Sequence, residues 1–213
     1  MKKENIRSNE LKRVIAMKTG NMLFEDVSEE ELDSVDELYL RAKKYSGEPT
    51  DIDLSEVSGF TKLKTLGLNG FELSTEDFGI ISKLGLSSLE LNGCETGSVV
   101  IDTADSLENL VINGGKIVDS EVRKSPKLLI VSETDVDFSK FDMSKTKRIF
   151  MRNCTIRNVG DLNSLSELEE INFDGSKVYD ISGTEIKEVN VADNVMVSFE
   201  DEVIKAGIEE IKV

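Results

Sequence analysis

The sequence predicts an α/β solenoid in which about nine short coils stack and each adds one strand to a parallel sheet. A pattern of the form apolar-x-x-apolar-x-apolar recurs along the chain at a nearly constant spacing, with starts at Leu63, Leu86, Leu107, Pro126, Thr146, Leu168, Ile186 and Ile208. The second and third apolar positions are two apart, so in a strand both side chains point to one face and the residue between them to the other. Stacking is the only way for such short coils to cover their apolar faces.

The copies of the pattern differ in strength. The strong copies are Leu63/Leu66/Leu68, Leu86/Leu89/Leu91, Leu107/Leu110/Ile112, Leu168/Ile171/Phe173, Ile186/Val189/Val191 and Ile208/Ile211/Val213. The other copies are Val35/Leu38/Leu40, Pro126/Leu129/Val131 and Thr146/Ile149/Met151. We expect residues 35–213 to form the solenoid.

The segment ahead of the coils predicts helices. Residues 8–18 have the spacing of an amphipathic helix with Leu11, Val14 and Ile15 inward, followed by Gly20 as a stop. A second short helix is expected at Ser28, whose spacing to Glu31 is that of a capping box. We expect residues 1–34 to form a helical cap that shields the open edge of the first coil, within one structural domain.

Coil length predicts what crosses the back of the solenoid. The coil that starts at Leu63 has room for a helix over residues 74–83, with Ser74 as N-cap, Glu76 and Asp77 in the first turn, and Ile80 and Ile81 in the core. The shorter coils, which start at Leu107, Pro126 and Leu168, have no such room, so we expect turns or extended segments there.

These motifs resemble a known family. Residues 86–94 (Leu-Ser-Ser-Leu-Glu-Leu-Asn-Gly-Cys) and 146–156 resemble the leucine-rich-repeat signature L-x-x-L-x-L-x-x-N/C-x-L, and residues 27–40 are similar to the helical cap of bacterial internalin-like proteins. The resemblance implies a right-handed solenoid with a concave parallel sheet, and with helices, turns or extended segments on the convex side. Other coils depart from the family because Phe71, Gly115, Thr134 and Ser176 replace the Asn or Cys, so a continuous asparagine ladder is not expected.

Composition narrows the possible functions. With 26 Lys and Arg against 42 Asp and Glu, the net charge is −16, which disfavours nucleic acid and anionic membranes as partners. The chain has no His, which excludes histidine-based acid–base or nucleophilic catalysis and His-containing zinc sites. We therefore predict no catalytic residue, no cofactor and no metal.

The two cysteines are expected to be separate buried thiols. Cys94 and Cys154 occupy the same repeat position, three strands apart. That separation is roughly 14 Å, well beyond the ~7 Å Cα limit for a disulfide. Unpaired thiols favour a reducing compartment, so we expect a cytoplasmic protein, or an exported one if a signal peptide was removed.

The residues between the apolar positions map the expected binding surface. The central outward column is Tyr39, Gly67, Glu90, Val111, Ile130, Phe150, Asn172, Asn190 and Lys212. Val111, Ile130 and Phe150 are apolar, Leu128 lies in the neighbouring outward column, and Lys147, Arg148 and Arg152 flank them. An apolar centre with an Arg rim is typical of a protein-binding site, in which we also include Tyr39. Two alternatives remain: these residues serve strand propensity alone, or the register is off by one and Leu128 and Ile130 point inward.

Acidic residues near the C-terminal end raise a metal alternative. Glu169, Glu170, Asp174, Glu188 and Asp193 are expected on one outward face, and hard cations prefer oxygen ligands. Because no fixed ligand spacing accompanies them, we interpret them as a solvated acidic face.

The sequence thus predicts a non-enzymatic module that binds a protein or peptide on its concave sheet. One alternative is a right-handed β-helix enzyme acting on acidic polysaccharide, whose coils have a similar length. Another is the recognition domain of an exported bacterial effector or surface protein.

Overall fold

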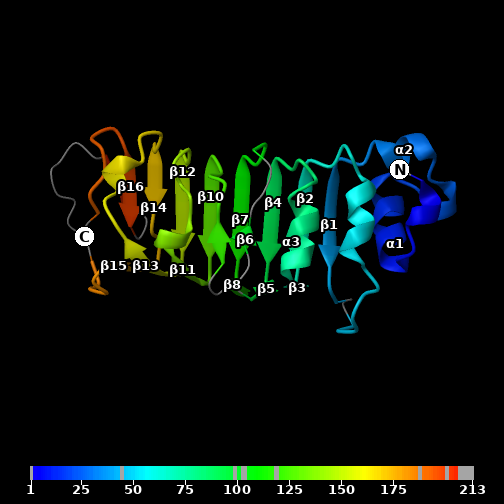
Figure 1. Cartoon of the computed structure of the whole chain (residues 1–213), viewed down its shortest axis with the longest axis horizontal. Coiled ribbons are helices and arrows are strands. Elements are labelled where there is room, and N and C mark those ends of the chain that lie inside the picture. The colour runs from blue at the N-terminus through cyan, green and yellow to red at the C-terminus, as the bar shows by residue number, and fades with distance from the viewer. Residues whose placement is uncertain are drawn as a thin grey trace.

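The computed structural model describes residues 2–43, 46–97, 100–101, 105–117, 120–186, 189–199 and 202–205. Within them the main sheet has nine strands, laid side by side along the molecule (Figure 1). In spatial order they are β1 (Glu37–Arg41), β2 (Thr65–Asn69), β4 (Ser88–Asn92), β7 (Asn109–Asn113), β10 (Leu128–Ser132), β12 (Arg148–Arg152), β14 (Glu170–Asn172), β16 (Met196–Phe199) and β17 (Glu202–Lys205). The first eight are parallel, and β17 pairs antiparallel with β16.

The repeated apolar positions form rows across this sheet. One row, in register from strand to strand, is Leu38, Leu66, Leu89, Leu110, Leu129, Ile149, Ile171 and Val197. Every member is at most 1% exposed, and the row two positions further along, from Leu40 to Met151, is buried as well. The predicted inward positions are therefore confirmed from β1 to β14, and stacking the coils buries them as one continuous core.

The copy Ile186/Val189/Val191 was wrong as a strand of the sheet. The strand that pairs with β14 is β16, so Val197 and not Val189 follows Ile171 in the buried row, and Ser198 takes the expected place of Asn190. The chain first forms an antiparallel bridge between Tyr179 and Glu185, and it adds its next strand to the main sheet only at β16. The final copy, Ile208/Ile211/Val213, and Lys212 lie outside the described residues.

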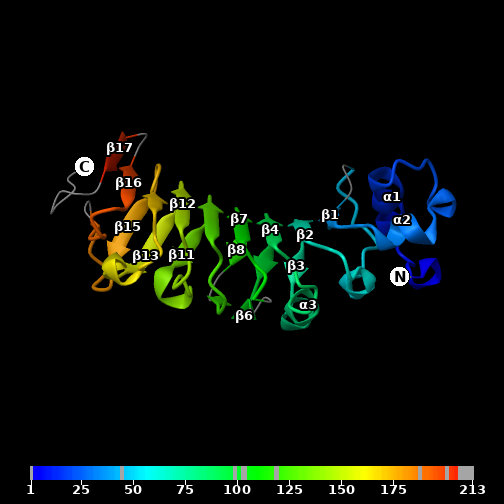
Figure 2. The same ribbon diagram turned by 90° about the horizontal axis from the view of Figure 1, so that it is seen from above.

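Shorter ladders and helices line the other side of the coils (Figure 2). Three small parallel sheets are formed by β3 (Glu72–Leu73), β5 (Glu95–Thr96) and β8 (Lys116–Ile117); by β6 (Val100–Ile101) and β9 (Glu121–Val122); and by β11 (Asp135–Asp137), β13 (Thr155–Val159) and β15 (Lys177–Asp180). Helix α3 (Thr75–Ile81) and 3₁₀ turns at Leu54–Gly59, Phe138–Lys140 and Leu162–Ser164 complete this side. Most coils thus contribute more than the single strand that the repeat pattern predicts.

Helix α3 forms for local reasons that the sequence already shows. The Ser74 hydroxyl accepts a hydrogen bond from the Asp77 N–H and the Asp77 carboxylate accepts one from the Ser74 N–H, which is a capping box. Ile81 is buried as expected, but Ile80 is only partly buried. Phe78 takes the second core position, because residues three apart share one face of a helix.

Two α-helices lie at the N-terminal end of the sheet (Figure 1). They are α1 (Asn9–Lys18), which contacts β1, and α2 (Glu29–Asp33), with 3₁₀ turns at Lys3–Asn5 and Phe24–Asp26. In α1, Leu11 and Ile15 are fully buried and Val14 is partly buried. The capping box between Ser28 and Glu31 is present. The N-terminal helices expected from the sequence are thus confirmed, whereas their likeness to an internalin cap stays a prediction.

Side chains at the Asn/Cys repeat position join neighbouring coils. The thiols of Cys94 and Cys154 each donate to a carbonyl of the preceding coil, at Leu68 and Val131, over 3.4 Å. Both thiols are buried and free, as predicted, and burial raises the pKa of each. Two of the departing residues serve similarly: the hydroxyls of Thr134 and Ser176 donate to Gly115 and Met151 in the preceding coils. Thiols and hydroxyls therefore replace an asparagine ladder.

Candidate functional site

The solvent-facing side of the main sheet carries one column of side chains in strict register. From β1 to β14 it consists of Tyr39, Gly67, Glu90, Val111, Ile130, Phe150 and Asn172, and Ser198 of β16, the next residue in register, is buried. This order agrees with the sequence prediction as far as Asn172. The polarity of the column changes along the molecule. Gly67 contributes no side chain and Glu90 a charged one, whereas the residues from β7 to β12 are apolar.

Four residues form what we call the apolar patch: Val111, Leu128, Ile130 and Phe150. Ile130 lies between Val111 and Phe150 in the register, and Leu128 is on the same face of the same strand. All four are partly exposed, whereas Leu129 and Val131, which alternate with them on β10, are fully buried. The alternative of a register slip by one position is therefore excluded, and the patch lies on the solvent side.

The three basic residues expected around the patch differ in their pairing. Lys147 donates to Glu169 over 2.9 Å, and this hydrogen bond raises the pKa of the ammonium group. The Arg152 guanidinium lies 3.5 Å from Asp174. Arg148 is exposed and aligned with Leu128, and among the described residues no ion pair engages it. Arg148 is thus the cation beside the patch that is available to a partner's carboxylate.

Tyr39 is not brought to the apolar patch, because β2 and β4 separate it from β7. Its ring lies across Gly67, where a Cβ atom would come within 2.2 Å of the ring. The phenol donates to Glu90 Oε1 over 3.3 Å. Burial, together with the negative charge of Glu90 and a hydrogen bond to Glu37, raises the pKa of Tyr39 to about 12. Gly67 therefore makes room for a ring that spans the start of the sheet.

A surface groove that the sequence did not predict lies at the N-terminal end of the molecule. We call it the N-terminal groove; it has a volume of about 870 Å³. Its lining comprises Asn9, Glu10, Arg13, Val14 and Met17 from α1, Tyr39 and Arg41 from β1, and Lys43, Ser46, Pro49 and Asp51 from the segment after β1. No sequence motif marks it, because its walls come from segments that are well separated along the chain.

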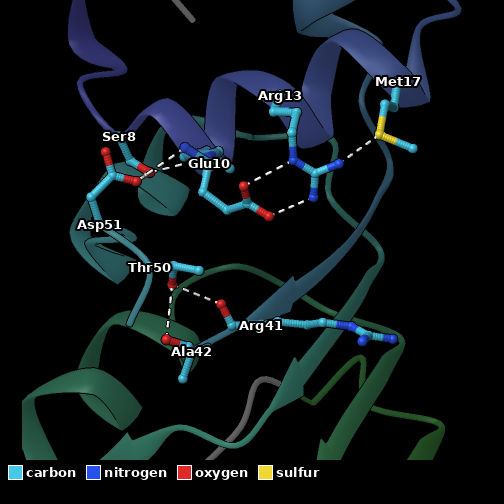
Figure 3. A network of polar contacts seen from close by, with 9 residues as sticks. Ser8, Glu10, Arg13, Met17, Arg41, Ala42, Thr50 and Asp51 are labelled. Atoms are coloured by element: carbon cyan, nitrogen blue, oxygen red, sulfur yellow. Dashed lines mark hydrogen bonds and ion pairs between the residues drawn. The ribbon is translucent and has the colours of Figure 1, made fainter. Parts of the chain in front are cut away.

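Hydrogen bonds hold the walls of the N-terminal groove in place (Figure 3). The Asp51 carboxylate accepts from the N–H groups of Asn9 and Glu10, over 2.7 and 3.0 Å, and these bonds lower the pKa of Asp51 to about 2. The Thr50 hydroxyl donates to the Arg41 carbonyl over 2.7 Å. On α1, Arg13 pairs with Glu10 and also reaches the sulfur of Met17. The segment at 50–51 is thereby tied to both α1 and β1.

Two of the five residues predicted for the acidic face near the C-terminal end form ion pairs. Glu169 and Asp174 pair with Lys147 and Arg152, and Glu188 lies outside the described residues. In the ranges that the structure describes, no three His, Cys, Asp or Glu side chains gather closely enough to hold a metal ion. Among the same residues, no helix has the length and apolarity needed to cross a bilayer.

Stacked parallel strands with a continuous inward apolar row define a solenoid of the leucine-rich-repeat kind. The chain is similar to an internalin from Listeria monocytogenes, with a TM-score of 0.57 and 17% identity over 84% of this chain. It spans 53% of the length of that internalin. No protein-family model matches the chain, and neither does any curated protein sequence. At this level of identity the likeness shows the fold.

Proposed function

We propose that the chain is a non-enzymatic module that binds a protein or peptide on the concave sheet of a right-handed leucine-rich-repeat solenoid. The apolar patch is the observation that carries the proposal. Its side chains stand on the solvent side of three neighbouring strands, where core packing does not require them. Contiguous apolar side chains in contact with water are a typical mark of a protein interface.

The arrangement of the patch favours specific binding. The central strand, β10, is hydrogen-bonded on both sides, so the patch is rigid before a partner arrives and little ordering cost accompanies binding. Phe150 supplies an aromatic anchor, and Arg148 supplies a cation at the edge. Aromatic and Arg side chains are enriched among residues that dominate binding energy. The partner surface that fits is an apolar one with a carboxylate at its margin.

The charge of the chain also bears on the partner. A net charge of −16 repels nucleic acid and anionic membranes, so we propose neither as a ligand. Free, buried thiols suit a reducing compartment, and we propose a cytoplasmic location; recognition by a domain of an exported bacterial protein is the alternative. We further propose that α1 and α2 act as an internalin-like cap.

The extra ladders favour one second candidate, a β-helix enzyme acting on polysaccharide. Around β4 to β9 the coils carry three parallel ladders, as β-helix coils do. Thermal unfolding with and without calcium, and with an acidic polysaccharide such as polygalacturonate, distinguishes the two. Stabilisation by calcium together with cleavage of the polymer would favour the enzyme, and neither is expected.

Capture from a lysate of the native host tests the binding proposal. The whole chain is immobilised beside Phe150→Ala and Ile130→Asp, with Arg157→Ala as a control variant on the far ladder. We expect a protein retained by the parent and by Arg157→Ala, and lost from both patch variants. Urea unfolding of each variant checks that folding is retained, as we expect. A set of captured proteins unaffected by both patch variants, or dimers of the chain alone that depend on the patch, would contradict the proposal.

A further inference from the structure

The N-terminal groove lies at an edge of the main sheet that offers unpaired backbone groups. β1 pairs with β2 and has no second strand neighbour among the described residues. Ala42 N–H donates to Asn69, and Asp36 C=O accepts from Thr65, so the even-numbered residues face β2. Because backbone groups alternate in direction along a strand, those of Tyr39 point away from β2. In the described parts of the chain, no hydrogen bond engages the Tyr39 N–H or C=O.

Apolar side chains stand in contact with water beside this edge. Of the large apolar residues that are exposed in the described chain, Met17 and Tyr39 both line the groove, at 67% and 49% exposure. Val14 and Pro49 extend the apolar lining on either wall. An exposed strand edge beside apolar side chains is a template for pairing with another strand. The walls are already held by the Asp51 and Thr50 hydrogen bonds, so the site is preformed.

The charges that line the groove indicate the chemistry of its occupant. Three cations, Arg13, Arg41 and Lys43, stand against two carboxylates, so the lining carries a formal charge of +1 in a chain of −16. Glu10 and Arg13 pair with each other and so neutralise one another, and the Asp51 carboxylate accepts hydrogen bonds from the start of α1. At an ionic strength near 0.1 M, charges beyond about 10 Å are largely screened, so the positive charge of the lining, and not the negative charge of the whole chain, determines which peptides the groove attracts.

We propose that the N-terminal groove binds an extended, acidic peptide segment, which adds to the edge of β1 as a further strand. Its backbone exchanges hydrogen bonds with the N–H and C=O of Tyr39. An apolar side chain of the peptide packs on Val14 and Met17, and an Asp or Glu side chain meets the ammonium group of Lys43. The site is separate from the apolar patch and does not depend on the function proposed for it.

Fluorescence anisotropy with defined peptides tests this proposal. The probes are two labelled sets of acetylated and amidated octapeptides, in which Val, Ile, Leu or Phe alternates with Asp or Glu in one set and with Lys or Arg in the other. We expect the whole chain to bind the acidic set at least tenfold more tightly. Methylation of every second backbone nitrogen should abolish binding in one register and be tolerated in the other, because only alternate amides face β1.

Matched variants place the binding in the groove. Charge reversal by Arg41→Glu with Lys43→Glu should weaken the acidic peptides at least tenfold, whereas Arg157→Glu with Lys177→Glu, the same charge change on β13 and β15, should not. Phe150→Ala should also leave this binding unchanged, which separates it from the apolar patch. Equal binding of both peptide sets, tolerance of methylation in both registers, loss with the control pair, or no binding at all would overturn the proposal.

Discussion

Two regions of the surface expose apolar side chains, and they differ in what lies beneath. The apolar patch is centred on β10, which is hydrogen-bonded on both sides, and its members are only partly exposed. The N-terminal groove stands at β1, which is paired on one side only, and Met17 and Tyr39 are more exposed than any residue of the patch. The patch thus offers side chains alone, whereas the groove also offers backbone.

The difference teaches how the same sheet can recognise two kinds of surface. A fully paired strand selects a partner by the shape and polarity of side chains. An edge strand selects an extended segment through its main chain, with neighbouring pockets and charges adding specificity. Rigid support is common to both, and it comes from strand pairing in the patch and from the Asp51 and Thr50 contacts in the groove.

The largest expected effect separates the two faces of β12. Ile149→Ala removes a fully buried side chain and should lower the free energy of unfolding by about 3 kcal/mol. Phe150→Ala, at the next position and facing solvent, should cost about 1 kcal/mol or less. Urea unfolding measures both. An equal loss of stability in the two variants would mean that Phe150 supports the core. The patch would then not be a free surface like the groove.

A second effect concerns the turn after β7, next to the patch. A Cβ atom at Gly115, where φ is +80°, would lie 2.0 Å from the backbone oxygen of Cys94, so the coils approach too closely for any side chain. Gly115→Ala should cost about 3 kcal/mol, from the left-handed conformation and the clash together. Gly114→Ala is the matched control, because φ is +64° but the space is open, and about 1 kcal/mol is expected. Similar losses in thermal unfolding would show that the coils can separate beneath the patch.

A third effect tests the support of the groove. Asp51→Asn removes the carboxylate that accepts from the start of α1, and should cost about 1 kcal/mol. The pKa of Asp51 is lowered in the folded state, so its stabilisation is complete above its ordinary pKa of 3.8 and is lost as pH falls towards about 2. The protection factors of α1 amides, which are exchange rates corrected for their intrinsic pH dependence, should therefore fall with acid in the parent, and Asp51→Asn should lack that component. If Asp51→Asn responds to acid as the parent does, Asp51 does not stabilise the wall of the groove.

The smallest effect sharpens the separation of Tyr39 from the patch. Tyr39→Phe removes a phenol whose hydrogen bonds to Glu90 and Glu37 lie at the surface, so stability should change by less than about 0.5 kcal/mol. Ultraviolet titration should lose the tyrosinate signal near pH 12, because burial and Glu90 raise the pKa of Tyr39 to about 12. A protein captured through the patch should still bind this variant. Loss of that binding would mean that Tyr39 and the apolar patch belong to one binding surface.

Several features could be predicted because local rules govern them. The two-position alternation of a strand placed Leu129 inward and Ile130 outward, and the structure has both there. Capping at Ser28 and Ser74 depends on residues three positions apart, so it too was visible in the sequence. The partner of the patch could not be predicted, because a surface restricts the polarity and charge of its ligand but does not identify the ligand.

By itself, the sequence determined the repeat, the buried rows and the helix starts, since each depends on spacing along a short stretch of chain. Only the tertiary structure decided that the chain skips Ile186/Val189/Val191 and returns at β16, because Val197 and Phe199 match the second and third apolar positions of the repeat but Asn194 stands at the first. It also decided that β17 turns back antiparallel and that α1, β1 and the segment to Asp51 enclose a groove. These features arise where distant segments meet, and which segments meet is settled by the packing of the whole chain.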